Sequence, residues 1–200
     1  MDLLYYLDLI GTFVFAISGT ISAAEKKLDL FGASVIGFIT AVGGGTVRDL
    51  LLDLHPITWL IDMYYIWAIV LGVLSTFLFR RYIVKLRRTL FIFDTIGIGV
   101  FTVLGIQKAL LVDILPVFAI IMGMVSATVG GVIRDILCNE IPLIFRKEIY
   151  ATACLAGGAI FFILNSFNLD LNLNYIISIL VIIGIRTVSI KMRLSMPNIK

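Results

Sequence analysis

The sequence predicts an all-α integral membrane protein with seven transmembrane helices, built as two inverted three-helix repeats plus a seventh helix. Three observations lead to this fold: the composition, the spacing of the apolar runs and an internal repeat. Of the 200 residues, 60% are hydrophobic and 14% are charged, and the mean hydropathy is +1.10. A water-soluble domain of this size would have too little polar surface to cover itself, so a bilayer is the solvent that fits.

Seven apolar runs come close to the roughly 20 residues that a helix needs to cross the hydrocarbon layer. They are Leu3–Ala24, Leu30–Leu52, Ile57–Phe79, Leu90–Ile106, Ile114–Cys138, Ile149–Leu164 and Leu171–Ile190. They divide the chain into a first repeat (3–79), a basic linker (80–89), a second repeat (90–164), and a seventh helix with its tail (165–200). We expect the seventh helix to be a peripheral packing or assembly element.

The distribution of basic residues predicts the orientation of the spans. With the N-terminus outside, the cytoplasmic side holds Lys26, Lys27, Arg80, Arg81, Lys85, Arg87, Arg88, Arg146, Lys147, Lys191, Arg193 and Lys200, whereas the outer loops hold Lys108 alone. This asymmetry is a strong positive-inside signal. It predicts a multi-pass protein of the inner (plasma) membrane with a cytoplasmic C-terminus. The basic stretch Arg80–Arg88 is expected to meet anionic lipid headgroups, and the short basic clusters argue against a nucleic-acid partner.

The internal repeat appears when the chain is compared with itself at an offset of 86 residues. Over positions 8–72, 18 of 65 residues are identical, whereas a shared apolar composition would give roughly 5. The matches include Gly44-Gly45 with Gly130-Gly131, Arg48-Asp49 with Arg134-Asp135, and Pro56 with Pro142. Because each repeat carries three spans, the second must enter the membrane from the opposite side, and a site near the midplane between the two halves follows.

Glycines interrupt the second and fifth predicted spans. Each glycine in a helix costs about 1 kcal/mol relative to alanine. Matched breaks there would free carbonyl groups to line a wet path, and close packing through small residues is the alternative. The candidate pore residues are Gly43, Gly44, Gly45, Gly130 and Gly131, with Thr40, Ser126 and Thr128 as nearby hydroxyl groups.

Two Arg-Asp pairs follow these glycines. Charged groups at such depth are expensive and find partners. Adjacent residues on a helix do not face each other, so Arg48 is not expected to pair with Asp49, nor Arg134 with Asp135. By depth, Asp8 should pair with Arg48 and Asp94 with Arg134. These pairs would clamp helices together, and the arginines could also shape the field at each pore mouth.

The sequence offers no constellation that points to enzyme chemistry. It contains no nucleophile–base pair, no paired catalytic carboxylates, no His/Cys cluster and no phosphate loop, so we expect neither catalysis nor a cofactor nor a bound metal beyond transient K⁺. His55 reads as a loop residue, and Cys138 and Cys154 read as buried structural thiols.

The doubled Gly-Gly-x-x-Arg-Asp motif and the 3+3+1 arrangement resemble the prokaryotic branch of the trimeric intracellular cation (TRIC) channel family. The motif residues are Gly44-Gly45-Thr46-Val47-Arg48-Asp49 and Gly130-Gly131-Val132-Ile133-Arg134-Asp135; in this chain Val129 replaces the counterpart of Gly43. The resemblance implies a homotrimer with an hourglass pore in each protomer that conducts monovalent cations and prefers potassium. It also implies kinks at the glycines of the second and fifth helices. Bacterial relatives are also described as transporters of small amino acids such as glycine.

Three functions therefore stand in order: a potassium-permeable channel, a secondary transporter of a small zwitterion, and a membrane scaffold. Inverted repeats occur in transporters as well as in channels, so the fold alone does not decide. The midplane windows Gly37–Gly45 and Gly123–Gly131 contain no charged residue, which favours a passive path lined by carbonyl and hydroxyl groups.

Overall fold

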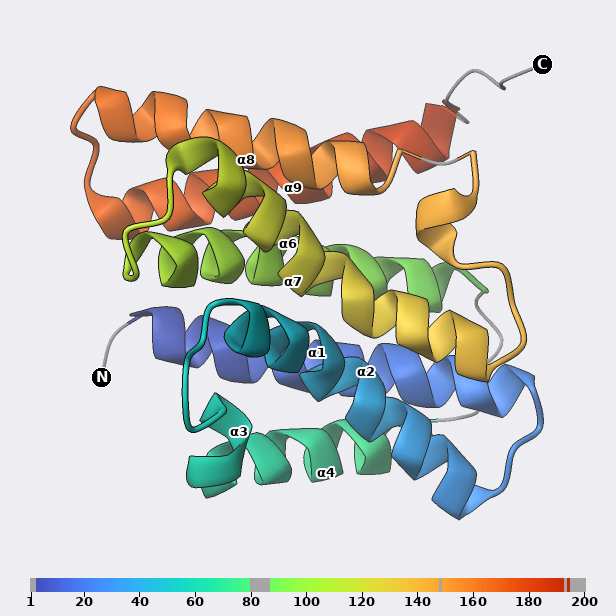
Figure 1. The fold of residues 1–200 in the computed structure, drawn as a ribbon. Helices are drawn as coiled ribbons and strands as arrows, with labels where there is room; N and C mark the ends of the chain where they lie inside the picture. Colours follow the sequence, from blue (N-terminus) through green and yellow to red (C-terminus); the bar gives the residue numbers. More distant parts are fainter. Residues whose placement is uncertain (1–2, 80–86, 148, 193, 195–200) are drawn as a thin grey trace.

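The computed structural model describes residues 3–79, 87–147, 149–192 and 194, and within them the only regular secondary structure is helical (Figure 1). The α-helices are α1 (Leu3–Glu25), α2 (Leu30–Leu51), α3 (Thr58–Ile61), α4 (Met63–Leu78), α6 (Arg87–Leu110), α7 (Pro116–Leu137), α8 (Ala151–Ser166) and α9 (Leu171–Met192), and one 3-10 turn, η1, covers Leu143–Phe145. The all-α prediction is confirmed for this part of the chain.

Among the described residues, five helices have the length and apolar composition to cross a membrane: α1, α2, α6, α7 and α9. The helices α4 and α8 are apolar but have 16 residues each. At 1.5 Å per residue they span about 24 Å, less than the roughly 30 Å of a bilayer's hydrocarbon core. Five of the expected spans are therefore confirmed in length and character, and crossing by α4 and α8 stays a prediction.

Several predicted boundaries were wrong. The run 57–79 is two helices, because Asp62 adopts an extended conformation and its carboxylate accepts a hydrogen bond from the amide of Tyr64 at 2.9 Å. Such a cap satisfies a free amide at the start of a helix, so α4 begins there. The fourth predicted span, Leu90–Ile106, is longer in the structure: it is α6, which starts at Arg87 and ends at Leu110. The basic linker, predicted as 80–89, therefore ends earlier. The expected headgroup contacts at residues 80–86 lie outside the described residues.

The centre of the bundle is formed by α1 and α6, which lie side by side (Figure 1). They are the two most buried of the five long apolar helices. On one side α4 packs against α1, and on the other α8 and α9 pack against α6. The helices α2 and α7 contact each other across this central pair, so they bring the two glycine motifs together.

The contacts in the centre are reciprocal between residues that lie 86 positions apart in the sequence. Phe15 stacks on Phe101 with ring centroids 5.1 Å apart. A Cβ atom on Gly11 would lie 2.9 Å from the Phe101 ring, and one on Gly97 would lie 2.2 Å from the Phe15 ring. Each phenylalanine therefore occupies space left by the glycine of the other half.

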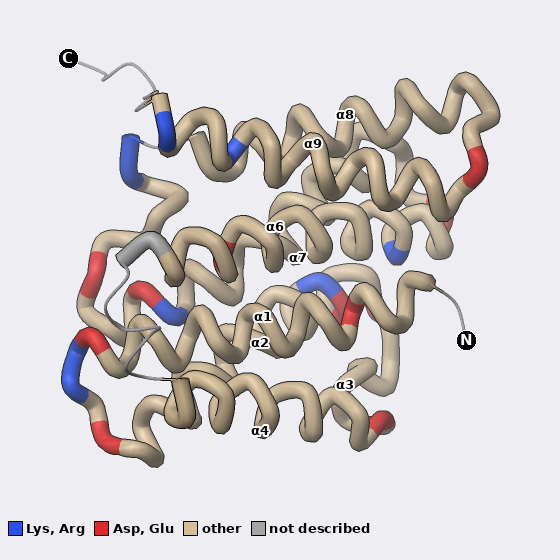
Figure 2. The backbone as a smooth tube through the Cα atoms, turned by 180° about the vertical axis from the view of Figure 1, so that it is seen from behind, with Lys and Arg blue, Asp and Glu red and all other residues tan. Residues whose placement is uncertain are grey.

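Charged residues gather toward the two ends of the bundle, and the middle is largely uncharged (Figure 2). The start of α1 and the end of α9 also lie at opposite ends of the bundle (Figures 1 and 2). Some of these charges lie inside the protein rather than on its surface: Arg48, Arg134 and Arg186 are the three largest fully buried side chains. These buried cations mark charged sites in the interior of the bundle.

Candidate functional site

Helices α2 and α7 approach each other closely at two glycines. A Cβ atom on Gly44 would lie 2.1 Å from the carbonyl oxygen of Ser126, and one on Gly130 would lie 2.4 Å from the carbonyl oxygen of Thr40. The two contacts are repeat equivalents, since Gly130 and Ser126 stand 86 positions after Gly44 and Thr40. Only glycine allows backbones to approach this closely, as in small-residue interfaces between membrane helices.

The predicted helix breaks are wrong in this structure. Helix α2 runs without interruption through Gly43, Gly44 and Gly45, α7 does so through Gly130 and Gly131, and no described glycine has a positive φ. The helical cost of these glycines is offset by packing, which was the alternative explanation. The glycines are not equivalent, because a Cβ atom on Gly45 would meet only the Arg48 guanidinium, at 3.5 Å or more.

The three predicted path hydroxyl groups are all buried. Those of Thr40 and Thr128 donate to carbonyl groups one turn earlier in their own helices, at 2.6 and 2.8 Å, to Ile36 and Met124 respectively. Ser126 instead accepts a hydrogen bond from Arg48 Nη1 at 3.2 Å. The Ser126 hydroxyl therefore joins the α2–α7 contact to a buried charge.

One buried charged site lies on α7, one turn after Gly130. We name it the Arg134 cluster; its members are Asp94, Arg134, Asp135, Tyr150 and Arg186. Arg134 Nη1 donates to Asp94 Oδ1 at 2.7 Å, and Nε donates to Asp135 Oδ1 at 2.8 Å. The contact between Arg134 and Asp94 is the one expected from depth. A fully buried ion pair of this kind is strongly destabilised when one partner is removed.

The second charged site lies on α2, one turn after Gly44. We name it the Arg48 cluster; its members are Asp8, Arg48, Asp49, Tyr65 and Lys108. Arg48 Nε and Nη2 both lie 2.8 Å from Asp49 Oδ1. Lys108 Nζ lies 3.5 Å from the same oxygen and donates to Thr58 Oγ1 at 2.6 Å. Each cluster thus contains two acidic and two basic side chains.

Two predictions about these charges were wrong. Each arginine pairs with the aspartate that follows it, because the guanidinium sits far enough along its flexible stem to turn back toward the next residue. The expected pair between Arg48 and Asp8 is absent among the described residues. Asp8 Oδ2 instead accepts a hydrogen bond from the Tyr65 hydroxyl at 2.9 Å, although Asp8 and Arg48 line the same small cavity.

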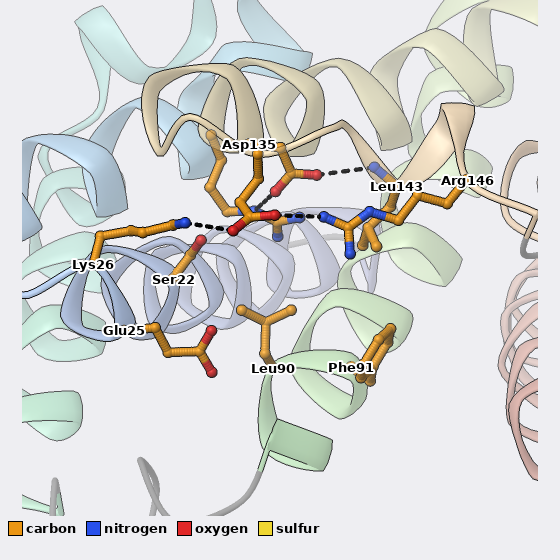
Figure 3. A pocket seen from close by; sticks show the side chains of 10 residues that line it. Ser22, Glu25, Lys26, Leu90, Phe91, Asp135, Leu143 and Arg146 are labelled. Carbon is orange, nitrogen blue, oxygen red and sulfur yellow. Dashed lines mark hydrogen bonds and ion pairs between the residues drawn. The ribbon is translucent and has the colours of Figure 1, made fainter.

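The two clusters differ in the space beside them. A cavity of about 610 Å³ reaches Arg134 and Asp135, and its lining also includes Ser22, Glu25, Lys26, Leu90, Phe91, Glu140, Leu143 and Arg146 (Figure 3). The cavity that reaches Arg48 and Asp49 has a volume of only about 20 Å³. Water and ions therefore have room on one side of the α2–α7 contact and very little on the other.

An ion-pair chain crosses the larger cavity. Lys26, in the loop after α1, pairs with Glu140, in the loop after α7, and Arg146 Nη2 contacts the other Glu140 oxygen at 3.1 Å (Figure 3). The hydrogen bond and positive charge of Lys26, with that of Arg146, hold the pKa of the Glu140 carboxyl below its usual 4.5. This chain joins the two halves where the cavity opens.

Two buried polar atoms of the Arg134 cluster, Asp94 Oδ2 and Arg134 Nη2, make no hydrogen bond within the described part of the chain. Leaving such groups unsatisfied costs about 1–3 kcal/mol each or more when they are charged. Asp94 Oδ2 is instead approached by Arg186 Nη2, at 3.7 Å. Sequence reasoning missed the tyrosines and the fourth charge of each cluster, Lys108 and Arg186, because neither cation has a counterpart in the other repeat.

A family model described as "Glycine transporter" matches residues 5–81 and 91–166, which is most of the chain. An inner membrane protein of Escherichia coli K12, UPF0126 YadS, is 39% identical over 98% of this chain and 96% of its own length. A UPF0126 membrane protein of Vibrio cholerae is 43% identical over 78% of this chain and 66% of its own length. The sequence relationship therefore extends over both repeats.

Solved structures of TRIC channels have the same fold. A TRIC channel orthologue from Rhodobacter sphaeroides superposes with a TM-score of 0.91 and 34% identity, covering 97% of this chain and 100% of the other. A TRIC cation channel studied for its conductance gives a TM-score of 0.86 and 37% identity, over 100% of this chain and 98% of the other. Together with the family match, these similarities show that the chain belongs to the TRIC family.

Proposed function

We propose that this protein is a cation channel that conducts potassium, with one path through each protomer between α2 and α7. The structural relatives described above are cation channels rather than enzymes, which supports this class. The observation that carries the proposal is the pair of cavities on either side of the α2–α7 contact. Each cavity ends at a buried Arg-Asp pair, and the two glycine contacts lie between them.

The chemistry of this contact suits a dehydrated cation. The carbonyl oxygens of Thr40 and Ser126 are the atoms that Gly130 and Gly44 approach. Each oxygen already accepts a hydrogen bond within its own unbroken helix. If the two helices separate, its second lone pair is free to replace water around an ion, as carbonyl groups do in potassium-selective pores. The conformation described here is then a closed one, shut at the glycine contact and on the side of the Arg48 cluster.

The exchanged contacts support an inverted repeat, and we propose that the chain crosses the membrane seven times. Gly44 meets Ser126 while Gly130 meets Thr40, and Phe15 stacks on its own counterpart, Phe101. Such an exchange is what a pseudo-two-fold axis between the halves produces, and the axis then lies in the membrane plane. We further propose a homotrimer in the inner membrane, with the N-terminus outside and the C-terminus in the cytoplasm.

The orientation predicts opposite labelling of two equivalent loops. Lys27 and Asp113 are 86 positions apart, both are exposed, and both adopt a positive φ in the turn after a long helix. Lys27→Cys should react with an impermeant thiol reagent only from the cytoplasmic side, and Asp113→Cys only from outside. The native cysteines, Cys138 and Cys154, are buried and should give little background. Labelling of both variants from one side would reject the inverted arrangement.

Recordings from purified protein in a planar bilayer test the function. With a tenfold KCl gradient, a potassium-selective current should reverse near the potassium equilibrium potential, about 59 mV for a monovalent ion. A reversal of opposite sign would indicate anion conduction and reject the proposal. Saturable glycine uptake into vesicles, together with an absence of single-channel currents, would also reject it in favour of a transporter.

A further inference from the structure

The last helix, α9, contributes a charge to the interior of the protein rather than only packing on its edge. Arg186 lies on α9 and has no exposed surface. Its Nη2 lies 3.7 Å from Asp94 Oδ2, its Nη1 donates to the Ile149 carbonyl at 3.0 Å, and its guanidinium carbon is 4.7 Å from the centre of the Tyr150 ring. The seventh helix therefore does more than pack on the edge of the bundle.

Asp94 lies between two guanidinium groups as a result. Arg134, from α7, donates to Asp94 Oδ1, and Arg186, from α9, faces Asp94 Oδ2. With Asp135, the cluster contains two negative and two positive side chains and is neutral as a whole. Without Arg186 it would carry one net negative charge beside the large cavity.

Residues of the neighbouring elements leave space for Arg186 and its partner Tyr150 and pack against them. Gly131 leaves room for the Tyr150 hydroxyl, which lies 2.9 Å from the position of a Cβ atom there. Tyr150 in turn stacks its ring against Arg186, a cation–π contact that is stronger when desolvated. Arg186 also lies beyond the second segment that the family model matches, 91–166. The repeat itself therefore does not supply this charge.

We propose that Arg186 is a positioning residue of the ion path, which holds Asp94 away from permeating cations and neutralises the Arg134 cluster. This inference rests on the proposed channel function. Asp94 Oδ2, facing Arg186, is then unavailable as a cation site. Releasing it would concentrate cations at one end of the path only, because Arg186 belongs to the Arg134 cluster, whereas Lys108 completes the other cluster.

The test is the shape of the current–voltage relation in symmetric KCl. Arg186→Gln should make currents at opposite voltages differ by roughly threefold or more, since one unit charge at an effective dielectric constant of about 20 changes local ion concentration several-fold within about 10 Å. Arg186→Lys should stay close to the parent. Arg186→Gln with Asp94→Asn restores neutrality and should return a symmetric relation. A purely structural role would lower the yield of channels without changing this shape.

Gly184→Ala is the matched control on α9, because a Cβ atom there would meet nothing within 4 Å. A parental current–voltage shape in Arg186→Gln would overturn the inference. If the parent protein carries no current, the channel proposal fails and the positioning role fails with it, whereas a thermal-unfolding cycle of Arg186→Gln and Asp94→Asn still tests the contact between the two side chains. Positive coupling in that cycle supports the contact, and additivity of the two changes rejects it.

Discussion

Leucine in place of Gly44 is expected to abolish conduction while leaving the protein assembled in the membrane. The position of a Cβ atom on Gly44 is 2.1 Å from the Ser126 carbonyl oxygen, so any side chain forces α2 and α7 apart. Overpacking of this kind typically costs about 1–3 kcal/mol. The isobutyl group would itself fill the space between the separated helices and cover the carbonyl oxygens that we assign to the ion, so the path would stay blocked. Single-channel recording of purified protein, after size-exclusion chromatography to check assembly, measures the effect.

The same motif supplies the controls. Gly130→Leu should act like Gly44→Leu, because Gly130 makes the repeat-equivalent contact with the Thr40 carbonyl. Gly45→Ala should conduct like the parent, since its methyl group would only touch the flexible Arg48 side chain at ordinary distance. If both leucine variants conduct normally, the path does not run between α2 and α7. If Gly45→Ala also fails, the loss reflects general disruption of the motif.

The sequence could predict the helical class and one ion pair, because these depend on patterns along the chain. Apolar runs set the helices, and the offset of 86 residues identified which positions correspond. Residue depth then placed Asp94 beside Arg134, where the structure has them 2.7 Å apart. Such statements need only the length of a helix and the side of the bundle from which it starts.

Whether the glycines break their helices could not be predicted from the sequence, because this depends on which atoms lie opposite them in the fold. A run of glycines is costly in an isolated helix, and either unwinding or close packing can account for it. The sequence does not show that Gly44 faces a backbone carbonyl on α7. The contact with Ser126 decides in favour of an unbroken helix in this conformation.

The partners of the charges were missed for a similar reason. The repeat leads one to expect symmetric pairs, yet Asp8 is satisfied by Tyr65, whereas Asp94 is satisfied by Arg134 and approached by Arg186. Tyr65 is not the repeat counterpart of Tyr150, which is Tyr64. The two clusters are alike in charge but are assembled from non-equivalent residues, so symmetry alone gives only part of each site.

The ion pair of Arg134 with Asp94 is expected to have the largest effect on stability. Both side chains are fully buried, and Arg134 also bonds to Ser18 at 2.7 Å. Arg134→Gln or Asp94→Asn alone would leave an uncompensated buried charge, which typically costs about 3–5 kcal/mol. Thermal unfolding in detergent of the two single variants and the double variant measures the coupling between them.

The comparison with the other cluster makes this measurement decisive. Coupling between contacting residues is typically about 0.5–3 kcal/mol, whereas separated residues are close to additive. We therefore expect strong coupling for Arg134 with Asp94, weaker coupling for Arg48 with Asp8, which share a cavity but no ion pair, and none for Arg48 with Asp94. An exchange of the Arg134 and Asp94 side chains should recover part of the loss, because it restores neutrality in the same buried space. Equal coupling in both clusters would contradict the asymmetry described here, and its absence from both would mean that the charges act on the path individually.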